Sequence, residues 1–252
     1  MDAGNASDIR ITSAQLVELI ANSYETREPR FCFILGSGAS VESGIPTGNR
    51  LEMTWMNCLM GIEDDKETKK KNPADTRRKA ENLKNSGLLF TSFSEIEEAW
   101  EAVREAVRQG KSCSIPSEYY FDIYNLRFYP DKPGGDKYSG DRYMESVMEG
   151  HHPSLGYYPL ALLLTKENLH NLVITTNFDT LVEKALNTYG DKEPLVANHE
   201  ALADYIVRGI QRPIIAKVHR GLFFKPFNKP EDTAKLATQW KGVLMDVFQQ
   251  YI

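Results

Sequence analysis

The sequence predicts an α/β fold: a doubly wound parallel sheet with a mainly helical insertion. Three short apolar runs, at 31–35, 171–176 and 213–218, are rich in β-branched residues and have the length of buried parallel strands. Segments with helical periodicity lie between them, and strands that alternate with helices form a parallel sheet covered on both faces. The segment 62–150 contains no comparable run and is therefore predicted to be the insertion.

The composition excludes several classes of protein. The 252 residues are 41% hydrophobic and carry a net charge of −5, which fits a globular protein without a general attraction to nucleic acid or anionic membranes. No apolar run approaches the roughly 20 residues of a membrane helix. The first residues lack the features of a signal peptide, so we expect a cytoplasmic location. The three cysteines are widely spaced and support neither a disulfide framework nor a zinc site.

Residues 1–61 are predicted to form the first part of the sheet domain. Apolar residues at helical spacing in 12–22 predict an amphipathic helix that covers one face of the first strand. That strand stops at Gly36 and Gly38, and a helix is predicted at 49–60. This order suits a phosphate group, because glycines allow close approach to the backbone and a helix start presents free N–H groups.

Residues 62–150 are predicted to form a helical insertion or small domain. Its charged stretch 63–79 has no apolar period and is expected to be a solvated loop or helix face. Ser94 opens a capping-box pattern, and apolar residues then recur at helical spacing up to Gly110. The aromatic segment 119–124 either belongs to a lid over a cleft or forms the insertion's own core. We favour the core, because aromatic residues dominate small cores.

Residues 151–252 are predicted to complete the sheet domain. Their elements are expected in the order helix 153–164, strand 171–176, helix 179–189, helix 198–210, strand 213–218 and helix 236–252. The last residues look like the approach to a further strand, so we expect the domain to be truncated at its C-terminus, as part of a longer protein. His151, His152 and His170 are expected to be caps or surface residues.

Small or polar residues follow each predicted strand, at 36–43, 177–179 and 219–221. In open parallel sheets, ligands bind at the carboxyl ends of the strands, so these segments are the candidate site. Each signal alone has a structural explanation. Asn and Asp often cap the helix that follows them, and a histidine is more often a core or surface residue than a catalyst.

Taken together, the segments resemble the three motifs of the sirtuin superfamily, in the same order and strand context. They read Gly36-Ser37-Gly38-Ala39-Ser40 with Ser43-Gly44-Ile45-Pro46, then Thr175-Thr176-Asn177-Phe178-Asp179, then Lys217-Val218-His219. The resemblance implies a Rossmann-like sheet of sirtuin type that binds NAD. The insertion matches none of the family's motifs.

The resemblance also implies residue roles. The cofactor-binding residues would be Gly36, Ser37, Gly38, Ala39, Ser40, Ser43, Gly44, Ile45, Pro46, Thr176, Asn177 and Asp179, of which the first five line the pyrophosphate and adjacent ribose. Asn177 and Asp179 would lie beside the nicotinamide and its ribose, and His219 would be the general base. Cleavage of the nicotinamide–ribose bond builds an oxocarbenium-like centre, so it needs orienting polar groups and a base that titrates near neutral pH. NAD would be the substrate, without a metal.

Departures from the family pattern indicate the branch. Protein deacylases of the superfamily are similar to one another in having Asp-Phe-Arg after the proline, a four-cysteine zinc site and a glycine directly after the histidine. Here Pro46 precedes Thr-Gly-Asn-Arg, and Arg220 separates His219 from Gly221. The chain looks closer to zinc-less sirtuin-like domains of bacterial antiphage defence proteins, which hydrolyse NAD. The resemblance then implies a homo-oligomer and a phage-derived trigger or partner sensed by the rest of the protein, with neither membrane nor nucleic acid as a partner.

Three other functions stay open. A non-hydrolytic module that binds NAD or ADP-ribose for regulation is suggested by Arg220 beside the proposed base. An NAD-dependent protein deacylase is disfavoured by the missing zinc cysteines. A dinucleotide oxidoreductase is weaker still, because the loop lacks the Gly-x-Gly-x-x-Gly spacing and no acidic residue closes a second strand about 20 residues later.

Overall fold

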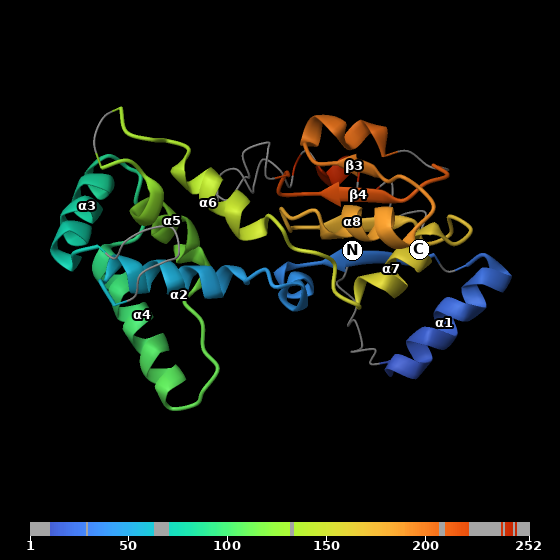
Figure 1. The fold of residues 1–252 in the computed structure, drawn as a ribbon, viewed down its shortest axis with the longest axis horizontal. Helices are drawn as coiled ribbons and strands as arrows, with labels where there is room; N and C mark the ends of the chain where they lie inside the picture. The colour runs from blue at the N-terminus through green and yellow to red at the C-terminus, as the bar shows by residue number, and fades with distance from the viewer. Residues whose placement is uncertain are drawn as a thin grey trace, which may run out of the picture.

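The computed structural model describes residues 11–28, 30–62, 71–131, 134–206, 210–221, 238, 240–243 and 245. Figure 1 shows helices α2 to α6 gathered at one end of the molecule and the sheet with its helices at the other. Most of the predicted helix 236–252 lies outside the described residues, as do the start of the charged stretch, 63–70, and the end of the predicted helix 198–210 at 207–209.

Four parallel strands form one sheet in the order β1-β2-β4-β3, which confirms the predicted parallel α/β sheet. The strands are β1 (Cys32–Leu35), β2 (Leu172–Thr175), β3 (Leu195–Ala197) and β4 (Ile214–Lys217). The apolar runs predict β1, β2 and β4 but not β3. This strand has three residues, too few to show a period.

Apolar clusters lie on both faces of the sheet, because successive side chains of a strand point to opposite sides. On one face, Val173 and Ile215 pack with α7 (Tyr157–Thr165) and α8 (Leu181–Tyr189). On the other face, a cluster joins the sheet to the 3₁₀ helix η3 (Glu200–Tyr205) and to Trp240; its strand members are Leu172, Ile174, Ala197, Ile214 and Ala216. The predicted helix 198–210 is therefore a short 3₁₀ helix over its described part.

The helical body has its own core. Its helices are α2 (Gly48–Leu59), α3 (Pro73–Asn85), α4 (Phe93–Arg108), α5 (Tyr120–Phe128) and α6 (Ser139–Met148), and all five contribute to one buried cluster. Trp55 lies at its centre, with ring centroids of Tyr120 and Phe128 each 5.4 Å away. The aromatic segment thus packs in a core, as favoured above, and α2 packs with the helices that follow it.

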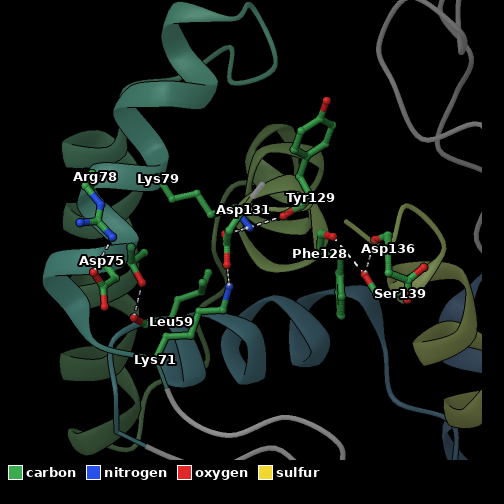
Figure 2. A network of polar contacts seen from close by, with 11 residues as sticks. Leu59, Lys71, Asp75, Arg78, Lys79, Phe128, Tyr129, Asp131, Asp136 and Ser139 are labelled. Carbon is green, nitrogen blue, oxygen red and sulfur yellow. Dashed lines mark hydrogen bonds and ion pairs between the residues drawn. The ribbon is translucent and has the colours of Figure 1, made fainter. Parts of the chain in front are cut away.

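The charged stretch 63–79 is not fully solvated where it is described. Its second half enters α3, which begins after the cap Asn72. Thr76 donates a hydrogen bond to the Leu59 carbonyl at 2.8 Å, and the nearly buried Lys79 binds the Tyr129 carbonyl and pairs with Asp131 at 2.9 Å (Figure 2). Polar side chains therefore tie α3 to α2 and to the chain after α5.

Two predicted helix starts differ from the structure. The side chain that caps α4 is Ser92, not Ser94, and it accepts the Glu95 N–H at 3.3 Å. Helix α7 begins at Tyr157 rather than at Pro153, because the preceding residues form a loop held against Ser43.

Helix α1 (Ser13–Thr26) does not cover the first strand, contrary to expectation. Its one buried residue is Ser23, whose Oγ lies 2.9 Å from Nε2 of His170. Ile34 of β1 stays 73% exposed. His170 is fully buried and also accepts the Phe31 N–H at 3.1 Å, so it is a core residue and not a cap or surface residue. None of the described helices has the length and apolar character needed to cross a membrane.

Candidate functional site

The three candidate segments meet because their strands are neighbours in the sheet. β1, β2 and β4 lie side by side and run parallel, so the residues after them emerge at one edge. A cavity of about 220 Å³ opens there. The candidate residues that line it are Ser37, Ser40, Ile45, Pro46, Thr176, Asn177, Asp179 and His219.

A chain of hydrogen bonds forms the polar side of the cavity. Asn177 Nδ2 donates to the Gly36 carbonyl and to Ser40 Oγ, each at 3.0 Å. Ser40 Oγ donates to Asp179 Oδ2 at 2.7 Å. One asparagine amide therefore connects the loop after β1 to the loop after β2, and its Oδ1 accepts no hydrogen bond within the described part of the chain.

Asp179 has a structural role as well as a place in the cavity wall. It is 8% exposed, and its Oδ1 accepts the N–H of Leu181, the first residue of α8, at 3.0 Å. The helix-capping explanation is thus right in part. The remaining oxygen, Oδ2, faces Ser40.

His219 is half-buried and lines the cavity, and burial lowers its pKa below the ordinary value of 6.5. Its ring forms no hydrogen bond with another described residue. A neutral imidazole at pH 7 with an available nitrogen can accept a proton from a bound group.

The next residue, Arg220, adopts a left-handed backbone conformation with φ of 68°. Its side chain forms a two-pronged ion pair with Glu200 at the start of η3, with Nε 2.7 Å from Oε2. Arg220 is not part of the cavity lining. The Arg220 side chain therefore binds away from the candidate site.

The helical body supplies most of the apolar side of the cavity, a role that the sequence pattern does not reveal. Its lining residues are Gly48, Leu51, Tyr120, Met144 and Met148, and Phe178 from the loop after β2 completes the apolar side. Tyr120 belongs to the aromatic segment assigned to the core, and it serves both the core and the cavity. Met144 and Met148 are four residues apart on α6, a spacing that a core helix also shows.

The glycine-rich segment is not a simple loop, since Ser37–Ser43 form a 3₁₀ helix, η1. Gly44 follows with φ of 92°, and a Cβ there would lie 2.8 Å from the His151 ring. His151 Nδ1 donates to the Ser43 carbonyl at 2.8 Å, and Ser43 Oγ accepts the Ser154 N–H at 2.9 Å. Ser43 and Gly44 thus hold the segment in place and do not line the cavity.

Gly36, Gly38 and Ala39 also lie outside the cavity lining. An added Cβ at Gly36 or Gly38 would meet nothing within 4 Å, and neither glycine has a left-handed φ. Neither packing nor backbone conformation therefore requires glycine at these two positions. His152, which we held as a surface residue, is exposed.

Within the described ranges, no three His, Cys, Asp or Glu side chains are grouped so as to hold a metal ion. No protein-family model matches the chain, and no curated protein is significantly similar to it. The function is therefore inferred from the residues around the cavity.

Proposed function

We propose that this chain is an NAD glycohydrolase domain, built on a doubly wound, Rossmann-like sheet of sirtuin type, that cleaves NAD to nicotinamide and ADP-ribose. The observation that carries the proposal is the convergence of Asn177, Asp179 and His219 on one cavity with an apolar opposite wall, where the His219 ring bonds no other described residue.

The arrangement supports hydrolysis at the ribose C1′. The bond from C1′ to nicotinamide breaks with its electron pair going to the leaving ring, water attacks C1′, and the water proton passes to His219. Asn177 Oδ1 has no other described partner and can orient the water. The Asp179 carboxylate places negative charge beside the developing cation.

The apolar wall suits the leaving group. Tyr120, Met144 and Phe178 offer a surface for a flat aromatic ring. The cavity volume of about 220 Å³ lies below the roughly 300–1,000 Å³ of pockets that enclose drug-sized ligands. The cavity therefore fits the nicotinamide–ribose part of NAD, with the rest of the dinucleotide outside it.

Gly36 and Gly38 support a phosphate group at the loop after β1. Because the fold requires glycine at neither position, the open space beside them is explained by a ligand that approaches the backbone closely. A pyrophosphate leading away from the cavity would use this space.

The test is nicotinamide release by the full-length protein in its triggered state. We expect Asn177→Ala to abolish release and His219→Ala to lower kcat by about 10²–10⁴-fold, the usual contribution of a general base. His152→Ala, at an exposed residue outside the cavity, serves as the matched control and should keep wild-type activity. Retained activity in Asn177→Ala would refute the assignment.

The alternatives have less support. The regulatory-module hypothesis was based on Arg220, whose side chain is bound to Glu200. Tight NAD binding by calorimetry with no turnover in any assembly state would favour that module over hydrolysis. Loss of acetyl groups from a peptide only in the presence of NAD would favour a deacylase.

The proposed wider role is that of an effector in antiphage defence, in which a cytoplasmic homo-oligomer depletes NAD when the rest of the protein senses a phage component. Cellular NAD measured during infection, with wild type and Asn177→Ala compared, tests this role. An equal fall in NAD in both strains would contradict it.

A further inference from the structure

An ion pair between a buried lysine and a partly buried glutamate adjoins the polar side of the cavity. Lys217, the last residue of β4, is 3% exposed. Its Nζ lies 2.7 Å from Oε1 of Glu183, in the first turn of α8, and donates to the Asp179 carbonyl at 2.5 Å. Lys217 is not a lining residue, so it would act on a bound molecule only through its neighbours.

This lysine connects the segments that carry the candidate catalytic residues. Its ammonium group holds the backbone of Asp179, in the same loop as Asn177. Its own carbonyl accepts the Arg220 N–H at 3.0 Å, which closes the turn that contains His219. A single residue therefore joins the turn after β4 to the loop after β2.

The energetics indicate that the pair is not there for stability alone. Desolvation of two charges away from water often costs as much as their attraction returns, so an apolar pair of similar size often gives a fold of equal stability. The pair is also imperfect, because Glu183 Oε2 is buried without a hydrogen-bond partner among the described residues. The hydrogen bond to the Asp179 carbonyl needs a long cationic side chain. This bond explains the presence of the ion pair.

We propose that Lys217 is a positioning residue that sets the spacing between His219 and the Asn177–Asp179 loop, with Glu183 as the counter-ion that holds its ammonium group in place. The expected effect of Lys217 on kcat rests on the proposed NAD hydrolysis, whereas its effect on the spacing of the two segments does not.

The test separates position from stability. In the double variant Lys217→Met with Glu183→Leu, the two charges leave together, so we expect cooperative unfolding within a few degrees of the wild-type Tm. Nicotinamide release should nevertheless fall at least tenfold in kcat with KM for NAD little changed. Lys192→Met is the matched control, because Lys192 binds Asn168 at 2.6 Å, outside the cavity lining. It should keep the wild-type kcat.

A second readout does not depend on activity. The chain has 5 histidines, so their ring proton signals can be followed by NMR during a pH titration, and His219→Gln identifies the His219 signal. We expect the pKa of His219 to lie below 6.5 in the wild type and to rise toward 6.5 in the double variant, because a loosened turn admits water to the ring.

A double variant with wild-type kcat and an unchanged His219 titration would overturn the proposal. If the double variant fails to fold, Lys217→Gln with Glu183→Gln, which also removes both charges but keeps polar side chains, should shift the His219 titration in the same direction; no shift there would also overturn it. If the wild type releases no nicotinamide, the hydrolase assignment fails, and the titration alone still decides the positioning role.

Discussion

Glu52 of α2 is a carboxyl group enclosed in the helical body. It is 1% exposed, its Oε1 has no hydrogen-bond partner among the described residues, and burial raises its pKa from 4.5 to about 8. The group is therefore mainly protonated at pH 7 in the folded protein, although it ionises readily in the unfolded chain.

This difference predicts a pH-dependent stability. Between about 4.5 and about 8, the folded state keeps a proton that the unfolded state releases, so the free energy of unfolding falls as pH rises. The slope is at most about 1.4 kcal/mol per pH unit. Glu52→Gln should remove this dependence and be the more stable protein at pH 8. Urea denaturation at pH 5.5 and pH 8 measures it.

Glu81→Gln, at an exposed glutamate of α3, is the control and should keep the wild-type dependence. If the free energy of unfolding changed equally with pH in the wild type and in Glu52→Gln, the Glu52 carboxyl group would have the same pKa in the folded and unfolded states.

The sequence indicated part of the site at the level of residues. Asn177, Asp179 and His219 were predicted from their places after strands and from the motif resemblance, and the structure gathers them at one cavity. Lys217 was quoted within a motif, yet nothing in a sequence distinguishes a buried lysine from a solvated one. Tyr120 could not be assigned to the cavity, because an aromatic residue in a core and one in a wall look alike in sequence.

At the level of elements, the start of α4 offers a direct comparison of two serines. Ser92 accepts the Glu95 N–H, whereas Ser94 lies inside the first turn. Ser92→Ala should lower the free energy of unfolding by about 1 kcal/mol, the usual cost of a lost N-cap, and Ser94→Ala by only a few tenths. Chemical denaturation of both variants at one pH measures the difference. A larger loss for Ser94→Ala would mean that the helix begins where the sequence pattern placed it.

Element types were predictable where an apolar period ran long enough. The helices α4 and α8 followed from such periods, and the strands β1, β2 and β4 followed from short continuous apolar runs. The three-residue strand β3 showed none. The packing of α1 was mispredicted, because Ser23 and Tyr24 contact His170, whereas the aliphatic residues Leu16, Val17 and Leu19 stay exposed.

At the level of the whole molecule, the cavity is lined by residues of both the sheet domain and the helical body. Tyr120→Ala should therefore raise KM for NAD by up to about tenfold, since aromatic contacts contribute about 0.5–1.5 kcal/mol beyond area burial. Tyr120→Phe keeps the ring and should retain the wild-type KM. Steady-state nicotinamide release measures both. Equal KM values for Tyr120→Ala and the wild type would exclude the helical body from substrate binding.

How the two parts meet could not be predicted from the sequence. Their relative placement depends on contacts such as those of Phe178, in the loop after β2, with the helical core and of Met148 with both cores. Local sequence patterns indicate the apolar period of each helix, but not the element against which the helix packs.

The pairing of β1 with β2 has a consequence for chain length. The Thr175 hydroxyl donates a hydrogen bond to the Leu35 carbonyl across the sheet, although the two residues are 140 positions apart. Closing a flexible loop costs entropy that grows only with the logarithm of its length, so doubling the loop adds about 0.6 kcal/mol. The sheet therefore tolerates a long intervening segment almost regardless of its size. What constrains that segment is the need to bring Tyr120 and Met144 back to the strand ends.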